Sequence, residues 1–147
     1  MTDTELKNFI AEYTDEVWNK ANVEAMNKYY APDYVHHDVS RPDVSTLADY
    51  KQWANDLFAG LSEVNVAIDD LVGEEGKAVK RWTASGLHDK TFAGIPATNK
   101  RVSFSGVSIY RMVGDKIAES WYVYDMFGLL QQLGAIPSPE RAEGQVG

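Results

Sequence analysis

The sequence contains no cysteine, which excludes disulfide bonds, thiolate nucleophiles and cysteine metal sites. It has no apolar run near the roughly 18 residues that a membrane helix needs, and polar residues rather than an apolar signal segment follow Met1. Basic residues are outnumbered, 14 against 22 acidic ones, and the formal net charge of −8 argues against nucleic acid or an anionic membrane as a partner. These absences predict a cytoplasmic protein that binds neither nucleic acid nor a membrane.

Two common catalytic motifs are also missing. There is no GxSxG serine-nucleophile motif and no glycine-rich phosphate loop. What the chain has is a hydrophobic content of 44% over 147 residues, with four Trp, eight Tyr and five Phe. This composition predicts one globular domain in which aromatic side chains form the core and the walls of a small-molecule pocket.

Apolar residues recur at spacings of three and four along the first part of the chain, which predicts three helices, over 4–18, 23–30 and 45–61. A short strand is expected at 34–38. Alternating segments then predict antiparallel strands at 64–72, 78–88, 101–113 and 117–125, followed by a helix at 126–134. The order predicts an α+β fold, a cone-shaped barrel of curved sheet around the helices. Residues 1–137 form the single domain, and 138–147 are expected to be a loose tail.

Asp125 closes the last predicted strand, where it shares a face with Trp121 and Val123. If that face is buried, desolvation raises the pKa of the carboxyl and Asp125 can exchange protons near neutral pH. Alternatively, Asp125 is the N-cap of the following helix, which would lower the pKa. The local sequence leaves both interpretations open.

Two adjacent histidines precede Asp38. Alternation puts His37 with Val35 on one face and His36 with Asp38 on the other, and because Val35 is apolar we expect His37 to point inward and to transfer protons. The alternative is a buried histidine bonded to backbone. A metal site of these residues with His88 has no recurrent ligand spacing, so we predict no metal.

Other polar residues depend on which strand face is buried. Arg81 on an inner face would need a partner such as Asp125, whereas an inward Trp82 would leave Arg81 in solvent. His88 follows Gly86, a candidate bulge, and alternation does not place it. Tyr110 shares a face with Phe104 and can bond a substrate oxygen. We expect a substrate to contact Arg81, Trp121, Tyr110, Phe104 and Trp53.

Four ordered segments and the C-terminal helix resemble a known family. The segments are residues 33–38, 81–88, 92–100 and 114–121, followed by Asp125 with the Leu-Leu-Gln-Gln-Leu-Gly run at 129–134. Together they resemble the SnoaL-like polyketide cyclase (ester cyclase) family of the nuclear transport factor 2-like superfamily, from about Leu6 to Ile136.

This resemblance implies a cone-shaped α+β barrel with one deep pocket, which is often paired as a homodimer through its sheet. It also implies an intramolecular aldol ring closure on a hydrophobic oxygenated small molecule, without metal or organic cofactor. The family's acid/base aspartate matches Asp125. Residues 107–110 lack the histidine of the family pattern, so His37 or His88 would replace it as a catalytic group. Alternatives are an isomerase or epoxide hydrolase of the same fold, or a binding protein without catalysis.

Overall fold

A single five-stranded sheet forms the body of the protein, in a computed structural model that describes residues 1–137. The predicted tail at 138–147 lies outside the described residues. The strand order is β1-β5-β4-β3-β2, in which β1 runs parallel to β5 and the other neighbours are antiparallel. The strand bounds are β1 (Tyr30–Asp38), β2 (Ser62–Glu74), β3 (Lys77–Leu87), β4 (Arg101–Val113) and β5 (Lys116–Tyr124).

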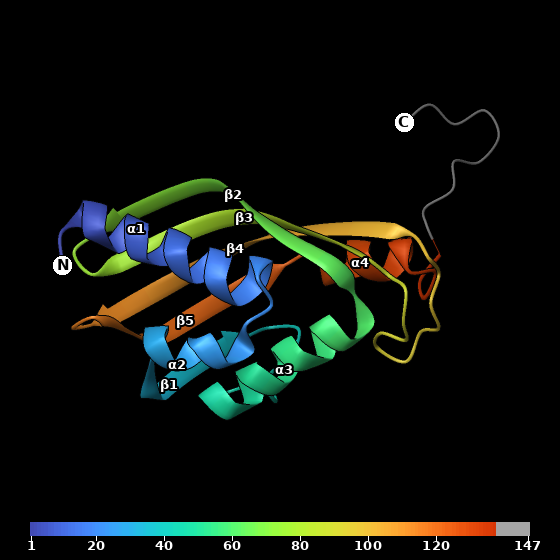
Figure 1. Ribbon diagram of the computed structural model, residues 1–147, viewed down its shortest axis with the longest axis horizontal. Coiled ribbons are helices and arrows are strands. Elements are labelled where there is room, and N and C mark those ends of the chain that lie inside the picture. The colour runs from blue at the N-terminus through green and yellow to red at the C-terminus, as the bar shows by residue number, and fades with distance from the viewer. Residues whose placement is uncertain (138–147) are drawn as a thin grey trace.

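Helices cover the concave side of this sheet (Figure 1). They are α1 (Asp3–Tyr13), the π-helical turn η1 (Thr14–Asn19), the 3₁₀ turn η2 (Val23–Ala25), α2 (Met26–Tyr29), α3 (Leu47–Gly60) and α4 (Met126–Gln132). Within residues 1–137, no helix is both long and apolar enough to cross a bilayer.

The two longest helices each begin at a capping motif in their local sequence. Thr2 and Glu5 form a capping box on α1, and Thr46 and Asp49 form the same motif on α3. Each hydroxyl accepts a hydrogen bond from the N3 amide while the N3 carboxylate accepts one from the N-cap amide, so two free amides are satisfied at each helix start. These short-range signals explain why the predicted helix starts are confirmed.

The largest departure from the predicted elements is at β1. The structure begins this strand at Tyr30 and carries it through Pro32, where the sequence predicted the end of a helix and a strand only from Tyr34. Because β1 is an edge strand, the missing amide of Pro32 interrupts no ladder on its open side. The pairing with β5 is irregular between Tyr30 and Val35, as expected around a proline.

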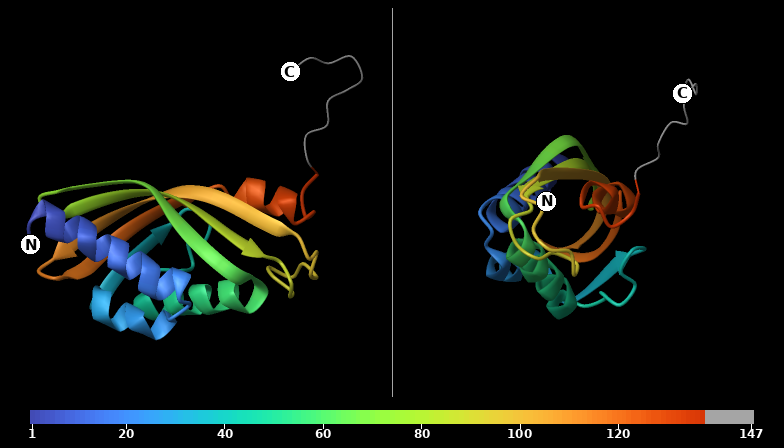
Figure 2. Two further views of the ribbon diagram at one scale, coloured as in Figure 1. Left: turned by 45° about the horizontal axis from the view of Figure 1, so that its top comes forward. Right: turned by 90° about the vertical axis from the view of Figure 1, so that its right-hand side faces the viewer.

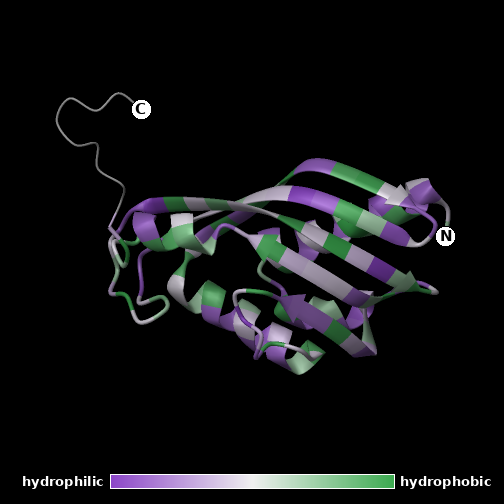
Figure 3. Ribbon diagram, turned by 180° about the vertical axis from the view of Figure 1, so that it is seen from behind, coloured by the Kyte–Doolittle hydropathy of each residue, from purple (hydrophilic) through white to green (hydrophobic). Residues whose placement is uncertain are grey.

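The predicted α+β architecture is confirmed, and the sheet curls into a cone without closing. Strands β1 and β2 stay at opposite edges, and the end-on view in Figure 2 shows the sheet bending around the interior. Buried residues alternate with exposed or half-buried ones along β3 and β4. Viewed from behind, the strands show interleaved hydrophobic and hydrophilic bands (Figure 3), as expected for two faces of unlike character.

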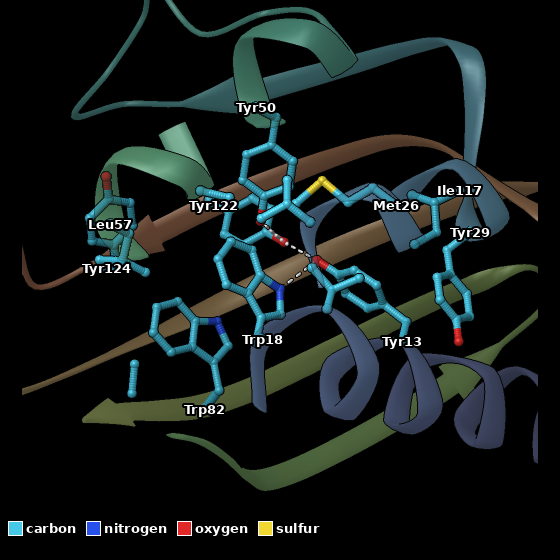
Figure 4. Packing of buried hydrophobic residues seen from close by; sticks show 14 of the residues in the cluster. Tyr13, Trp18, Met26, Tyr29, Tyr50, Leu57, Trp82, Ile117, Tyr122 and Tyr124 are labelled. Atoms are coloured by element: carbon cyan, nitrogen blue, oxygen red, sulfur yellow. Dashed lines mark hydrogen bonds between the residues drawn. The ribbon is translucent and has the colours of Figure 1, made fainter. Parts of the chain in front are cut away.

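Tyrosines make up much of the core. Figure 4 shows Tyr13, Trp18, Tyr50 and Tyr122 pointing toward one another from α1, η1, α3 and β5. Aromatic residues bury large areas but bring polar atoms with them, which must be hydrogen-bonded inside a protein. This requirement gives the interior an ordered set of hydroxyl groups next to the cavity described below.

Candidate functional site

A cavity opens between the helices and the concave face of the sheet. Its apolar wall consists largely of the aromatic side chains of Trp18, Trp53, Trp82 and Phe104, together with the aliphatic Leu57 and Val66. The space open to the centre of a water-sized molecule is about 40 Å³, and one buried water needs roughly 10–15 Å³ by that measure. The cavity therefore has room for a few water molecules.

Polar groups enter this wall from three strands and one helix. His36 and Asp38 come from β1, Lys80 from β3, and the hydroxyls of Tyr50, Tyr122 and Tyr124 from α3 and β5. His36, Asp38 and Lys80 are at most 6% exposed. Buried charged and titratable groups beside an apolar cavity are the usual mark of a functional site.

His36 is held between two aromatic rings. It stacks on Tyr50 with centroids 4.2 Å apart and on Tyr122 at 5.0 Å. Its Nδ1 is 2.6 Å from the hydroxyl of Tyr34, which also bonds Ser120. Burial, with a smaller contribution from nearby His37, lowers the pKa of His36 to about 4. His36 is therefore neutral at pH 7.

Asp38 lies two residues along β1 on the same face. Its Oδ2 accepts a hydrogen bond from the hydroxyl of Tyr124 at 2.9 Å, and its Oδ1 accepts one from the amide of Ser40 at 2.8 Å. Burial and the neighbouring Asp38 carboxylate raise the pKa of Tyr124, so this phenol remains a donor. The two bonds fix a buried carboxylate at the cavity wall and leave lone pairs for a ligand.

The tyrosine hydroxyls form a directed hydrogen-bond chain. Trp18 Nε1 and the Tyr30 hydroxyl both donate to Tyr13, at 2.8 and 2.7 Å, so the proton of Tyr13 is left for Tyr122 at 3.3 Å. Tyr122 also accepts from Tyr50 at 2.7 Å. Burial raises the pKa values of Tyr30, Tyr50 and Tyr122 well above the ordinary range. These three side chains are therefore neutral phenols near neutral pH.

The catalytic interpretation of Asp125 requires a buried carboxyl, and the structure contradicts it. Asp125 is exposed, does not line the cavity, and is the N-cap of α4, where its Oδ1 accepts a hydrogen bond from the amide of Gly128 at 2.8 Å. Desolvation, on which the proposed proton exchange depended, is absent at this position. The capping interpretation is the one the structure supports, because β5 turns Val123 and Asp125 outward and Tyr122 and Tyr124 inward.

His37 and Trp121 also lie on the outer side of the sheet, contrary to their predicted roles. Their rings stack at 5.2 Å with 10° between the planes, and His37 Nε2 is 2.7 Å from Glu119. The rings cover each other because His37 and Trp121 are opposite in the β1–β5 register. Val35, which suggested that this face points inward, is itself 41% exposed.

His88 is buried but does not line the cavity. Its Nδ1 accepts from the amide of Thr98 at 3.2 Å, so the ring proton is on Nε2, which donates to the carbonyl of Ile95 at 3.2 Å. These bonds tie the segment after β3 back to the strand end. The arrangement gives His88 a structural position in place of the predicted catalytic one.

The sequence left two positions open for Arg81, and the structure places it in solvent. Trp82 points inward and bonds Ser108 through Nε1 at 2.8 Å, while Arg81 points to solvent with Asp69 4.0 Å away. Arg81 therefore does not contact the cavity or Asp125. Phe104 and Trp53 do line the cavity, and Tyr110 is fully buried behind it, 3.4 Å from the Tyr122 hydroxyl. Whether these three bind a substrate stays a prediction.

Sequence reasoning missed His36, Asp38 and Lys80 as cavity residues. Tyr34 was the available signal on β1, because it shares a face with His36 and Asp38 and large aromatics are usually buried. On β3, an inward Trp82 carries Lys80 inward with it. Within residues 1–137, no three His, Asp or Glu side chains are grouped so as to hold a metal ion.

Solved structures share this architecture around the cavity. AclR, a candidate hydroxylase from Streptomyces galilaeus, superposes with a TM-score of 0.86 at 26% identity, covering 95% of this chain and 87% of AclR. A candidate polyketide cyclase from Acidithiobacillus ferrooxidans gives 0.78 at 30% identity, covering 87% and 93%. TsrD from Streptomyces laurentii gives 0.81 at 25% identity, covering 92% and 99%.

No curated protein matches the sequence. A family model does: the model for the SnoaL-like polyketide cyclases matches residues 8–133 and so takes in every strand and every lining residue of the cavity. The chain therefore belongs to the SnoaL-like polyketide cyclase family.

Proposed function

We propose that this protein catalyses proton transfer on a hydrophobic, oxygenated small molecule with its own side chains, and that the reaction is an intramolecular aldol ring closure. The observation that carries the proposal is that the buried carboxylate of Asp38 and the neutral imidazole of His36 both lie on one wall of an apolar cavity. Family membership supports the reaction class, and proteins of similar structure include a candidate cyclase and a candidate hydroxylase.

Asp38 acts as the base in this proposal. Its carboxylate takes a proton from the carbon next to a carbonyl, and the carbonyl oxygen gains the negative charge of an enolate. The enolate carbon then attacks a second carbonyl of the same molecule, forming one carbon–carbon bond. The resulting alkoxide takes the proton back from Asp38, so the product is an isomer of the substrate.

His36 acts as the hydrogen-bond donor to the enolate oxygen. With the proton on Nε2, its Nδ1 accepts from the Tyr34 hydroxyl, which in turn accepts from Ser120. A neutral imidazole fixed between Tyr50 and Tyr122 offers a donor without needing to reorganise as charge develops. The cavity walls contribute by folding the substrate so that its two carbonyls meet.

Exchange of hydrogen next to a carbonyl tests the base directly. We expect the protein to accelerate deuterium incorporation into 2-indanone, a flat ketone, in D₂O, as followed by NMR. Asp38→Asn should lower this acceleration by about 10²–10⁴-fold, because the amide cannot take the proton. Its carbonyl oxygen can still accept from Tyr124, so the fold should survive, as circular dichroism would show.

Asp33→Asn is the matched control. It is the same substitution on the same strand, but the side chain of Asp33 is exposed on the other face of β1. It should exchange 2-indanone at the wild-type rate. Undiminished exchange in Asp38→Asn would show that Asp38 is not the base.

A second candidate function is binding without turnover, which the small volume of the cavity favours. In that case the wild type would bind 2-indanone and leave its rate of deuterium incorporation at the value in buffer. An isomerase would start with the same proton removal and return the proton to a different carbon, so product analysis separates it from a cyclase.

We also propose that two copies pair through the outer face of the sheet. Two register pairs lie there side by side, Val107 opposite Val123 and Ile109 opposite Trp121. Val107 and Ile109 are each 38% exposed, and Val123 is 58% exposed. A contiguous apolar patch of this kind on a soluble domain usually marks an interface, and the family resemblance supports a second copy as the occupant.

A further inference from the structure

Lys80 is a buried cation without a counter-ion among residues 1–137. It is 2% exposed and lines the cavity, and no carboxylate of those residues lies within 4.0 Å of its Nζ. Its Nζ donates to Thr14 Oγ1 at 2.9 Å, and that hydroxyl uses its own proton on the carbonyl of Ile10. The Tyr110 hydroxyl is also close enough to interact with this ammonium group. An ammonium group has three donors, so at least one of them is left without an acceptor.

The end of the Lys80 side chain lies near the rings of two tyrosines. Its Nζ lies 5.3 Å from the ring centroid of Tyr13 and 5.5 Å from that of Tyr110, within the range of cation–π attraction. Ring faces partly offset the loss of hydration but accept no conventional hydrogen bond. A buried charge compensated in this way remains costly, and an anionic oxygen on a ligand would remove much of that cost.

The sheet register connects Lys80 to the proposed base. Lys80 is opposite Ser108, Ser108 is opposite Tyr122, and Tyr122 is opposite Asp38. All four side chains are buried on the concave side, so one row across the sheet begins with an ammonium group and ends with a carboxylate. Three strand spacings separate these ends by roughly 14 Å along the sheet, which explains why they form no ion pair.

We infer that Lys80 is a binding site for an anionic oxygen of the substrate, a carboxylate or a phenolate. The substrate class is then a flat hydrophobic molecule with an acidic oxygen at one end and the reacting carbonyl at the other. The position of the reacting carbonyl near Asp38 rests on the proposed function, whereas anion binding at Lys80 does not.

Benzoate and benzamide test this inference, because they share a shape and differ in charge. Tryptophan fluorescence reports binding, since Trp18, Trp53 and Trp82 line the cavity. We expect wild type to bind benzoate about 10-fold more tightly than benzamide, as charge-assisted hydrogen bonds exceed neutral ones. In Lys80→Met the two dissociation constants should agree within about 2-fold, since no cation remains to distinguish them.

Lys77→Met is the matched control, an identical substitution at an exposed position of the same strand. It should keep the wild-type preference for benzoate. Lys80→Gln guards against a folding defect in Lys80→Met, because its amide can still donate to Thr14 while it lacks the charge. It should also lose the preference.

Two results would overturn the inference. One is a wild type that does not prefer benzoate over benzamide. The other is a Lys80→Met or Lys80→Gln protein whose melting temperature changes while its benzoate preference stays, which would make Lys80 a purely structural link to Thr14. Asp38→Asn separates this failure from that of the proposed function, because it should lose hydrogen exchange on 2-indanone and still prefer benzoate.

Discussion

His36 owes its charge state to the packing around it. A histidine in an unfolded chain has a pKa near 6.5, but the buried ring of His36, stacked between Tyr50 and Tyr122, has a pKa of about 4. The folded protein therefore holds this ring neutral in a range where the unfolded chain protonates it. A residue proposed to donate a hydrogen bond to an enolate keeps that function at mildly acidic pH.

The same shift predicts how stability depends on pH. Between about pH 6.5 and pH 4 the unfolded chain binds a proton at His36 that the folded protein does not, so the free energy of unfolding decreases as pH falls through this window. The full effect is on the order of 3 kcal/mol. Urea unfolding of wild type and His36→Asn at several pH values would measure it, and the variant should show a shallower slope.

His37→Asn is the control for that measurement, because His37 is exposed on the opposite face of β1. Between pH 6.5 and pH 5 we expect this variant to lose stability nearly as the wild type does. Equal slopes in His36→Asn and wild type would contradict the assignment of a neutral buried His36.

At the scale of single elements, β4 brings two walls of the cavity together at Gly106. A Cβ atom there would lie 2.6 Å from the carbonyl oxygen of Val123, 2.7 Å from the Trp82 ring and 2.7 Å from Tyr124 Cβ. Only glycine allows this approach, since backbone and Cβ atoms cannot move aside as a side-chain end can. Trp82 and Tyr124 therefore lie close together in the cavity wall.

The segment from Asp89 to Lys100 is held to the rest of the domain through His88 and Phe92. His88 bonds the carbonyl of Ile95 and the amide of Thr98, and Phe92 packs so closely on Gly60 that a Cβ there would lie 2.5 Å from Phe92 Cβ. Gly60 is the last residue of α3, the helix that supplies Tyr50, Trp53 and Leu57 to the core and cavity. The segment thus supports the end of that helix.

We predict that His88→Ala loosens this segment. The substitution leaves the amide of Thr98 without its partner and the carbonyl of Ile95 with only the amide of Phe92, which should lower the free energy of unfolding by about 2–4 kcal/mol. Hydrogen exchange followed by NMR should show faster exchange at Thr98 and Ile95.

Lys90→Ala, at an exposed position of the same segment, should leave those exchange rates unchanged. Wild-type exchange at Thr98 in His88→Ala would show that the ring does not hold the segment.

At the scale of the whole molecule, the two faces of the sheet differ in character. The concave face carries the cavity and the polar row from Asp38 to Lys80, while the convex face carries the patch of Val107, Ile109, Trp121 and Val123. Neighbouring strands place these apolar side chains together because their register pairs them directly. A dimer formed through this patch would leave the cavities of both copies accessible.

Val123→Lys tests the proposed dimer. A lysine on each copy would place like charges in a desolvated interface, which we expect to raise the dimer dissociation constant about 100-fold or more. Size-exclusion chromatography with light scattering would show a dimer for wild type and a monomer for the variant at the same concentration.

Val72→Lys, at a 55% exposed position on the far edge strand β2, should remain dimeric. A monomeric wild type at high protein concentration, or a Val123→Lys protein that still pairs, would contradict the proposed interface.

The sequence by itself determined the elements and much of the fold. Turn residues and the two periodicities are local properties, so they predicted α3, α4 and the strands β2 to β5 to within a few residues. Alternation also grouped His36 with Asp38 and His37 with Val35 correctly. The family resemblance added the curved sheet and the cavity. Both follow from the path of the backbone, so neither requires knowing which side chains line the cavity.

Only the tertiary structure decided which of the two faces of each strand is buried. On β1 and β5 both faces carry apolar and polar residues, and the helices cover one face through contacts between segments far apart in the chain. That packing turned His36, Asp38 and Lys80 into the cavity and left Asp125, His37, Arg81 and Trp121 outside it. Burial is a non-local property, and the local sequence around these residues is compatible with either side.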